Sequence, residues 1–220
     1  MRRSRRLLFN KRAIVGIEAA IVLIAFVIIA AAFAFMAINM GLFATQRSKD
    51  TIAQGLRESS SPLQLDGNIF LRVNETNMRA EAIIIPLRAM GVKYVPMGAN
   101  ETVVSISISG QQKLGYANIY YGIDRTYDPK NKTFDELSNQ ANSTAKSFPH
   151  AVLLVENSDG DEALDASEKG FLMIGLGSSN AANPRDIITI EIRVEKSAPL
   201  TIEFVVPESL TASAWNMVVG

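Results

Sequence analysis

The stretch "AAIVLIAFVIIAAAFAFMAI", from Ala19 to Ile38, contains only Ala, Ile, Val, Leu, Phe and Met. Its 20 residues match the length that crosses the hydrocarbon core of a bilayer as an α-helix. Glu18 immediately precedes the stretch, and residues 19–46, between Glu18 and Arg47, carry no charge. The sequence therefore predicts a long hydrophobic helix in the N-terminal part of the chain.

Large apolar residues surround the whole circumference of this predicted helix, so no polar stripe is left to face water. Five alanines between residues 30 and 37 allow neighbouring helices to approach closely. We expect the helix to continue to about Glu58, where the Ser-Ser-Ser-Pro run of residues 59–62 ends it. The residues expected to be covered by lipid or by other helices include Leu23, Phe26, Ile29, Phe33, Met36, Met40 and Phe43.

A basic leader precedes the helix. The first 12 residues hold six of the 22 basic residues and no acid, so the remainder carries 16 basic against 22 acidic residues. The positive-inside rule predicts that the N-terminus lies in the cytoplasm and that the chain after residue 45 lies outside. Because the remainder has a net charge of −6, we expect no nucleic-acid partner.

From residue 67 onward the chain consists of short β-rich segments separated by Gly, Pro, Asn and Asp. Residues 104–109 and 188–194, within two of the predicted strands, alternate strictly between apolar and polar side chains, as in antiparallel strands with one buried face. The predicted fold class is α+β, a long hydrophobic helix followed by an antiparallel β-sandwich of the immunoglobulin-like kind. The eight predicted strands span residues 68–73, 81–89, 102–109, 116–122, 151–156, 170–176, 187–195 and 200–206.

No catalytic motif stands out. The absence of cysteine excludes disulfides, thiolate zinc sites and a cysteine nucleophile, and the single histidine excludes a histidine-rich metal site within one chain. The "GLGSS" of residues 175–179 lacks the third glycine of a dinucleotide-binding site. His150 follows Pro149 in a predicted loop, where we expect it on the surface or at a strand edge. The sequence therefore predicts a protein that is not an enzyme and that requires no cofactor.

The acidic segment "NSDGDEALDASE", from Asn157 to Glu168, resembles a twelve-residue calcium loop in the spacing of its oxygen ligands. The sixth position, where such a loop needs glycine, is Glu162, and the flanking segments are predicted strands rather than helices. A structural Ca²⁺ site and a solvated acidic hairpin loop both remain open. The candidate calcium ligands are Asn157, Asp159, Asp161, Asp165 and Glu168.

Four Asn-X-Thr sequons follow the hydrophobic segment, and all of them lie in predicted polar loops or strand edges. Such positions suit N-glycosylation of a secreted surface, although the short pattern also arises by chance. The candidate glycosylation sites are Asn74, Asn100, Asn131 and Asn142.

The segment "KRAIVGIEAAIVLIAFVIIAAAFAFMAINMGLFATQRSK", residues 11–49, resembles the archaeal flagellins or archaellins, and in particular their crenarchaeal branch. It combines a short basic leader, Gly16, the aliphatic run and the "INMGLF" segment of residues 38–43. In the β-rich remainder the resemblance is one of architecture, with "VENSDGDEALDASEKG" and "APLTIEFVVPESL" similar to recurrent archaellin segments.

The resemblance implies a class III signal peptide that a prepilin-type signal peptidase removes, leaving the hydrophobic segment on the mature protein. Aligning Gly16 with the family's later glycine places the cut between Ala13 and Ile14, where Ala13 replaces the usual Gly. The alternative cut lies between Gly16 and Ile17. The expected domains are then a cleaved signal peptide (1–13), a filament-core helix (14–60) and an outer β-sandwich (61–220).

The resemblance further implies a structural subunit of the archaeal flagellum, or archaellum, that forms a helical homopolymer for swimming. The expected partners are other copies of the chain, the signal peptidase, the archaellum assembly machinery and, before assembly, the membrane. The expected location is an extracellular filament on the archaeal cell surface. Two alternatives remain: an adhesive type IV-like pilin, and a single-span membrane protein with an extracellular binding domain. Glu18 either pairs with a neighbouring subunit's new amine or is stabilised by the helix dipole.

Overall fold

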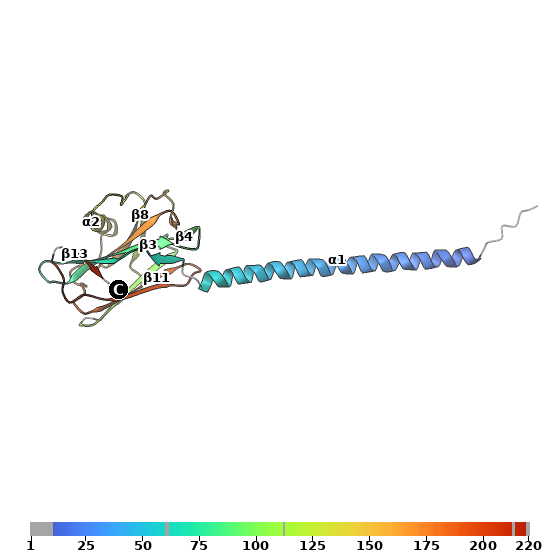
Figure 1. Ribbon diagram of the computed structural model, residues 1–220, viewed down its shortest axis with the longest axis horizontal. Helices are drawn as coiled ribbons and strands as arrows, with labels where there is room; N and C mark the ends of the chain where they lie inside the picture. Colours follow the sequence, from blue (N-terminus) through green and yellow to red (C-terminus); the bar gives the residue numbers. More distant parts are fainter. Residues whose placement is uncertain (1–10, 60–61, 112, 213, 219–220) are drawn as a thin grey trace, which may run out of the picture. The chain divides into compact units, whose positions relative to one another are not determined.

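The computed structural model describes residues 11–59, 62–111, 113–212 and 214–218. The chain divides into two compact units, residues 1–55 and 56–220, and Figure 1 draws their elements along the chain. Each unit is described separately below. Of the predicted signal peptide, residues 1–10 lie outside the described residues.

Helix α1 extends from Lys11 to Ser59, a run of 49 residues without proline. At 1.5 Å per residue its length is about 70 Å. Its predicted end near Glu58 agrees with the observed end to within one residue. The segment Gly16–Ala53 is long and apolar enough to cross a membrane, judged by length and composition.

The β domain contains a large and a small sheet. The large sheet has the order β13-β2-β3-β10-β8-β7, with β1 paired to β3, and the small sheet has the order β12-β11-β5-β6. A separate pair joins β4 (Tyr94–Pro96) to β9 (Ala163–Asp165). The large sheet comprises β1 (Leu63–Leu65), β2 (Ile69–Val73), β3 (Ala80–Ala89), β7 (Tyr120–Asp124), β8 (His150–Glu156), β10 (Lys169–Gly175) and β13 (Trp215–Val218). The small sheet comprises β5 (Thr102–Ser109), β6 (Leu114–Tyr116), β11 (Ile187–Val194) and β12 (Leu200–Val205).

The main hydrophobic core lies between the two sheets. Alternate residues of β5 and β11, such as Ile106 and Ile190, are opposite one another in register and are buried. They pack in one cluster with Ile83 and Leu153 from the large sheet. The predicted fold class, a long apolar helix followed by a β domain with mostly antiparallel strands, is confirmed.

The prediction of one strand over residues 116–122 is wrong. Strand β6 ends at Tyr116 and β7 begins at Tyr120. The intervening Asn118 turns the chain, because its side-chain oxygen accepts a hydrogen bond from the backbone N–H of Tyr120. β7 then pairs with β8 in parallel, which departs from the otherwise antiparallel pairing of the sheets.

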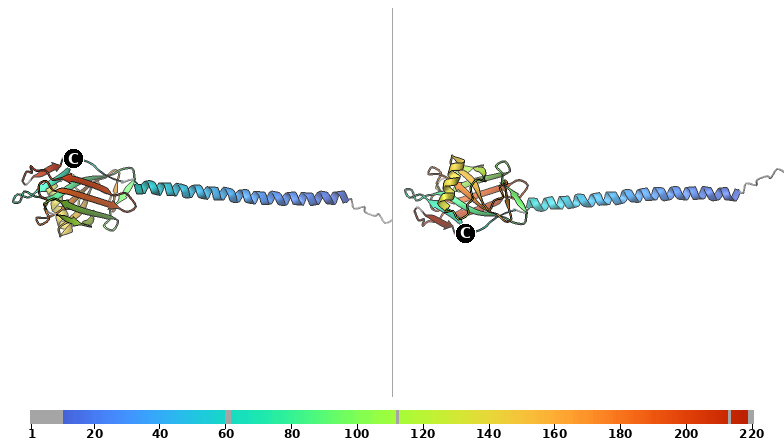
Figure 2. Two further views of the ribbon diagram at one scale, coloured as in Figure 1. Left: turned by 90° about the horizontal axis from the view of Figure 1, so that it is seen from below. Right: turned by 90° about the horizontal axis from the view of Figure 1, so that it is seen from above.

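Helix α2 (Phe134–Ala145), which the sequence analysis did not predict, covers the other face of the large sheet. Figures 1 and 2 show α2, the large sheet and the small sheet as successive layers. A capping box begins the helix, since Thr133 accepts from the backbone of Glu136 and the Glu136 side chain accepts in return. Leu137 and Ala141 face the sheet, which explains why β8 is buried on both faces.

Candidate functional site

The apolar side chains of α1 that the structure describes, between residues 16 and 53, are all exposed. The predicted filament-core residues are between 53% exposed, at Ile29, and 70% exposed, at Met40. Soluble monomers rarely present a continuous apolar surface of this size. Helix α1 therefore carries all seven predicted filament-core residues, each of them exposed: Leu23, Phe26, Ile29, Phe33, Met36, Met40 and Phe43.

The hydroxyl groups of α1 are satisfied within the helix itself. Thr45, Ser48 and Thr51 each donate to the carbonyl oxygen four residues earlier, at 2.8–2.9 Å. A hydroxyl bonded in this way can enter an apolar environment without leaving an unpaired donor. These three hydroxyls are therefore compatible with burial, whereas the charges of Arg47, Lys49 and Asp50 in the same segment would need partners there.

Both candidate cleavage positions lie in the first turns of α1. The Ala13–Ile14 and Gly16–Ile17 bonds are within the helical backbone that starts at Lys11. At Gly16 no other part of the chain lies within 4 Å of the space that a Cβ would occupy. The position of the cut stays a prediction.

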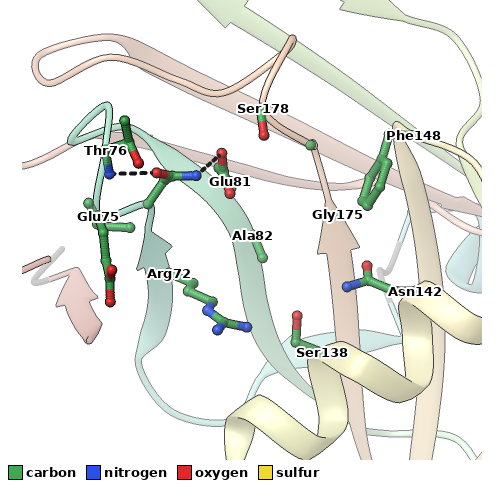
Figure 3. Close-up of a pocket in the computed structure, with 13 residues that line it drawn as sticks. Arg72, Glu75, Thr76, Glu81, Ala82, Ser138, Asn142, Phe148, Gly175 and Ser178 are labelled. Carbon is green, nitrogen blue, oxygen red and sulfur yellow. Dashed lines mark hydrogen bonds between the residues drawn. The ribbon is translucent and has the colours of Figure 1, made fainter. Parts of the chain in front are cut away.

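The four sequons differ in their surroundings. Asn100 and Asn131 lie in turns with exposed side chains. Asn74 is half-buried, and its side-chain nitrogen donates to Glu81 at 2.6 Å while its oxygen accepts from the backbone N–H of Thr76 at 2.7 Å (Figure 3). Asn142 is also half-buried and lies inside α2. Glycosylation of all four stays a prediction.

A pocket of about 470 Å³ lies beside α2, and sequence reasoning did not identify it. Residues from the β2–β3 turn, α2, and the end of β10 line it, including two of the sequon residues, Asn74 and Asn142. Figure 3 shows Arg72, Ser138 and Asn142 directed toward the same space. No local pattern marks this pocket, because its lining comes from segments more than 100 residues apart.

The acidic loop is held closed by its own carboxylates. Glu168 is buried, and its two carboxylate oxygens accept from the backbone N–H groups of Asp159 and Asp165, at 3.1 and 2.8 Å. Asp161 in turn accepts from the backbone of Ala163 at 2.8 Å. These contacts turn the carboxylates of Glu168 and Asp161 toward the loop backbone.

Within the described ranges, no three His, Cys, Asp or Glu side chains are grouped so that they could hold a metal ion. Asn157 adopts a left-handed conformation with φ 60° and is exposed. Asp159, Asp161 and Asp165 line a shallow pocket next to β4, together with other residues. Calcium binding by the loop stays a prediction, and it requires the carboxylates to turn from the backbone to the ion.

Of the two positions expected for His150, the surface and a strand edge, the surface position is wrong. It is the first residue of β8 and is 1% exposed, with Nδ1 donating to the carbonyl oxygen of Ser147 at 2.8 Å. Burial lowers the pKa of His150, and this hydrogen bond opposes the shift. Its Nε2 has no hydrogen-bond partner in the part of the chain that the structure describes. A histidine packed in this way has a structural role.

Comparison with known proteins identifies the family. The model of the archaeal-type flagellin family matches residues 13–204. The "Probable flagellin 1" of Aeropyrum pernix is 40% identical over 202 residues, which cover 91% of this chain and 95% of that protein. The "Probable flagellin 1" of Archaeoglobus fulgidus is 29% identical over 213 residues, 93% of this chain and 95% of that protein.

Solved structures share the fold. The archaeal flagellum of Methanospirillum hungatei strain JF1 aligns with a TM-score of 0.53 at 16% identity, covering 93% of this chain and 99% of that one. Flagellin FlaB1 from Methanocaldococcus jannaschii aligns with a TM-score of 0.55 at 15% identity, covering 72% and 97%. On the family match and the sequence identity, the chain belongs to the archaeal-type flagellin family.

Proposed function

We propose that this structural subunit of the archaellum filament polymerises through α1 into a helical homopolymer used for swimming. The supporting observation is the apolar surface of α1, where 17 large hydrophobic side chains are exposed in the single chain. Covering each of them contributes about 1.5–3 kcal/mol relative to water, so the helix needs lipid or protein around it. Membership of the flagellin family favours other copies of the helix as the final partner.

The geometry of association determines whether the chains form a filament or a ring. Contacts that repeat head-to-tail without closing generate an open helical filament rather than a ring. In this arrangement the helices of many copies form the core, and the β domains form the outer surface of an extracellular filament. The chain itself has no enzymatic role and binds no nucleic acid, and the archaellum assembly machinery is its partner at the cell surface.

Before assembly, the basic leader holds the precursor in the membrane with its N-terminus inside. A prepilin-type signal peptidase cuts between Ala13 and Ile14, which removes the six basic residues of the leader. The freed helix then exchanges lipid contacts for protein contacts. Mass spectrometry of the filament protein tests this step, because a mature chain that begins at Ile14 supports it and one that begins at Ile17 supports the alternative cut.

The outward-facing β domain carries the glycans. Exposed turns place Asn100 and Asn131 where a modifying enzyme can reach them. Asn74 and Asn142 have less room, because both are half-buried. Glycopeptide mass spectrometry of purified filaments is expected to find higher occupancy at the two exposed positions than at the two half-buried ones, and the reverse order would contradict this assignment.

The acidic loop, if it binds Ca²⁺, does so as a structural site. At a free calcium concentration 100 times the Kd, binding stabilises the folded chain by about 2.7 kcal/mol. The melting temperature of the full chain in detergent should then rise with added calcium, and Asp161→Asn should reduce the rise. Asp128→Asn, which changes an exposed aspartate outside the loop, serves as the matched control. An unchanged melting temperature in excess calcium would rule the site out.

The polymerisation proposal is tested with a charge at the helix centre. Ile28→Asp should abolish filaments, because an unpaired carboxylate buried in an apolar core is strongly destabilising. Val103→Asp, on the exposed face of β5, is the matched control and should assemble normally. Electron microscopy of sheared cell supernatants provides the measurement, and normal filaments from Ile28→Asp would contradict the buried-core arrangement.

A further inference from the structure

We propose that the pocket beside α2 is a saccharide-binding site that takes one sugar ring. Its volume of about 470 Å³ lies within the range of roughly 300–1,000 Å³ for small-molecule sites. None of its lining residues belongs to α1 or to the acidic loop. Four features of its lining point to a sugar.

The first feature is a set of polar groups without partners inside the chain. Ser138 is 4% exposed, and its hydroxyl makes no hydrogen bond to any residue that the structure describes. The side-chain amide of Asn142 is half-buried and likewise makes none within those residues. Figure 3 shows both groups directed into the pocket from α2. Both groups reach the open space of the pocket, so they are free to hydrogen-bond a ligand rich in donors and acceptors.

The second feature is an aromatic wall. Phe148 lines the pocket and its side chain is 53% exposed. The ring rests against Gly177, where an added Cβ would lie 2.8 Å from Phe148 Cγ, and near Gly175, where an added Cβ would lie 2.5 Å from His150 Cε1 and 3.0 Å from a Phe148 ring carbon. Behind it the ring contacts that of His150, with centroids 5.0 Å apart. The two glycines therefore make room for Phe148 and leave one of its faces open to the pocket.

An open aromatic face suits a sugar in particular. The face of the ring carries negative charge density, and the C–H groups on one side of a pyranose present weakly positive hydrogens to it. The hydroxyl groups at the rim of the same sugar ring can then bind Ser138 and Asn142 on the opposite wall. An aliphatic ligand would satisfy the aromatic wall but leave the polar groups unpaired.

The third feature is the charge balance of the lining. Arg72 is the single cation among the lining residues, and it shares its charge with Asp135 at 3.3 Å. Glu75 and Glu81 contribute two carboxylates to the same lining. A phosphate or carboxylate ligand would meet more negative than positive charge. A neutral sugar avoids this cost, and the carboxylates can accept hydrogen bonds from its hydroxyls.

The fourth feature is the position of Asn142 itself. It belongs to a sequon, and Figure 3 shows its amide directed into the pocket. A sugar attached to this side chain would therefore occupy the pocket directly. The ligand has two sources: a glycan on Asn142, which rests on the proposed glycosylation, or a saccharide that comes from elsewhere. Both place a sugar ring in the space lined by Phe148 and Ser138, and only a free saccharide also meets the unmodified amide of Asn142.

The test uses assembled filaments and saturation-transfer NMR, with glucose and N-acetylglucosamine as the free sugars. If the pocket is open, native filaments transfer saturation to the C–H protons of at least one of these sugars. Phe148→Ala should weaken the transfer on the order of fivefold, as expected for the loss of an aromatic contact. Tyr94→Ala removes an exposed aromatic ring that does not line this pocket and should leave the transfer unchanged.

Ser138→Ala provides a second variant in case Phe148→Ala alters the fold. It removes one hydroxyl that has no intramolecular partner among the described residues, so the fold should be retained while the transfer weakens by about fivefold. If a glycan on Asn142 already fills the pocket, native filaments show no transfer, Asn142→Gln filaments do, and mass spectrometry finds the glycan on Asn142.

The proposal is overturned if neither native nor Asn142→Gln filaments transfer saturation to either sugar. Equal transfer from the native, Phe148→Ala and Ser138→Ala filaments would overturn it as well. These outcomes are distinct from a failure of the proposed function, since every arm starts from filaments that have already formed. Failure to polymerise would be seen first, by electron microscopy, and in the native chain.

Discussion

Helix α1 and the β domain place their apolar residues in opposite ways. Every side chain that the structure describes from Gly16 to Ala53 is exposed, whereas Ile83, Leu153 and Ile190 of the β domain are fully buried. The β domain buries its main hydrophobic core within one chain. The apolar residues of α1 can be covered only by lipid or by other molecules, so this region is selected for assembly rather than for folding of the monomer.

A matched pair of leucine truncations gives the largest expected contrast. Leu153→Ala leaves a cavity between the two sheets and should destabilise the β domain by about 2–5 kcal/mol. At roughly 2–4 °C per kcal/mol for a domain of this size, its melting temperature should fall by about 4–20 °C. Leu42→Ala, on exposed α1, should leave that melting temperature unchanged. Circular dichroism of the full chain in detergent measures both.

In assembled filaments, Leu42→Ala should have the larger effect of the two substitutions on filament stability. Leu42→Ala removes an apolar contact of the proposed filament core, so filaments should dissociate at a lower detergent concentration than those of the native chain. Equal filament stability for native and Leu42→Ala chains would indicate that this part of α1 lies outside the core. A lower melting temperature of the Leu42→Ala monomer would show that α1 also contributes to the fold of the β domain.

A second prediction concerns the buried carboxylate that joins β7 to α2. Burial alone would raise the pKa of Asp124, but hydrogen bonds from Gln140, Thr126 and Thr144 outweigh it and hold the pKa below the ordinary value of 3.8. Because the folded pKa is the lower one, this stabilisation is present above the unfolded pKa. It is lost as the pH falls through the folded pKa.

Asp124→Asn should therefore cost about 1–3 kcal/mol at pH 7 and flatten the loss of stability below about pH 4. Denaturant unfolding of the β domain between pH 2 and 7, followed by near-ultraviolet circular dichroism, gives both quantities. Asp128→Asn, at an exposed position in the following loop, is the control. An acid profile of Asp124→Asn that parallels the native one would assign the acid sensitivity to other groups.

A smaller effect is expected at the start of α2. Thr133→Ala removes the N-cap hydroxyl that accepts from the backbone of Glu136, and should cost about 0.5–2 kcal/mol. Thr133→Ser keeps the oxygen and should recover most of the loss. The change is measured by denaturant unfolding. If Thr133→Ala and Thr133→Ser are equally destabilised, packing of the Thr methyl group and not the cap is responsible.

The sequence predicted α1 and the alternating strands because their signals are local. Twenty apolar residues specify the helix by composition, and the β-rich run predicted over residues 102–109 has the same bounds as β5. In α2 the polar composition of "FDELSNQANSTA" obscured a weaker signal, the capping box of Thr133 and Glu136 followed by Leu137 and Ala141. A search for a capping box followed by apolar residues four positions apart would have predicted this helix.

The candidate pocket could not be predicted in the same way. Arg72, Ser138 and Gly175 come from three elements that only the tertiary fold brings together. The acidic loop shows the opposite case, since its ligand spacing is visible in the sequence. The spacing did not reveal that Glu168 binds the loop backbone, because that contact depends on how the turn folds.

The smallest effect is expected where the β domain presents charge to water. Arg185 and Glu208 form an ion pair, and both side chains are more than 70% exposed. Solvent screens such a pair, and ordering two long side chains costs entropy, so Arg185→Ala should change the free energy of unfolding by less than about 1 kcal/mol. Denaturant unfolding at low and high salt measures this change in the free energy of unfolding.

The exposed surface of the β domain should thus tolerate the loss of a charge, whereas the exposed surface of α1 should not tolerate the gain of one at Ile28. A loss of several kcal/mol from Arg185→Ala would mean that this exposed surface, like that of α1, is covered in the assembled protein or contributes to the fold.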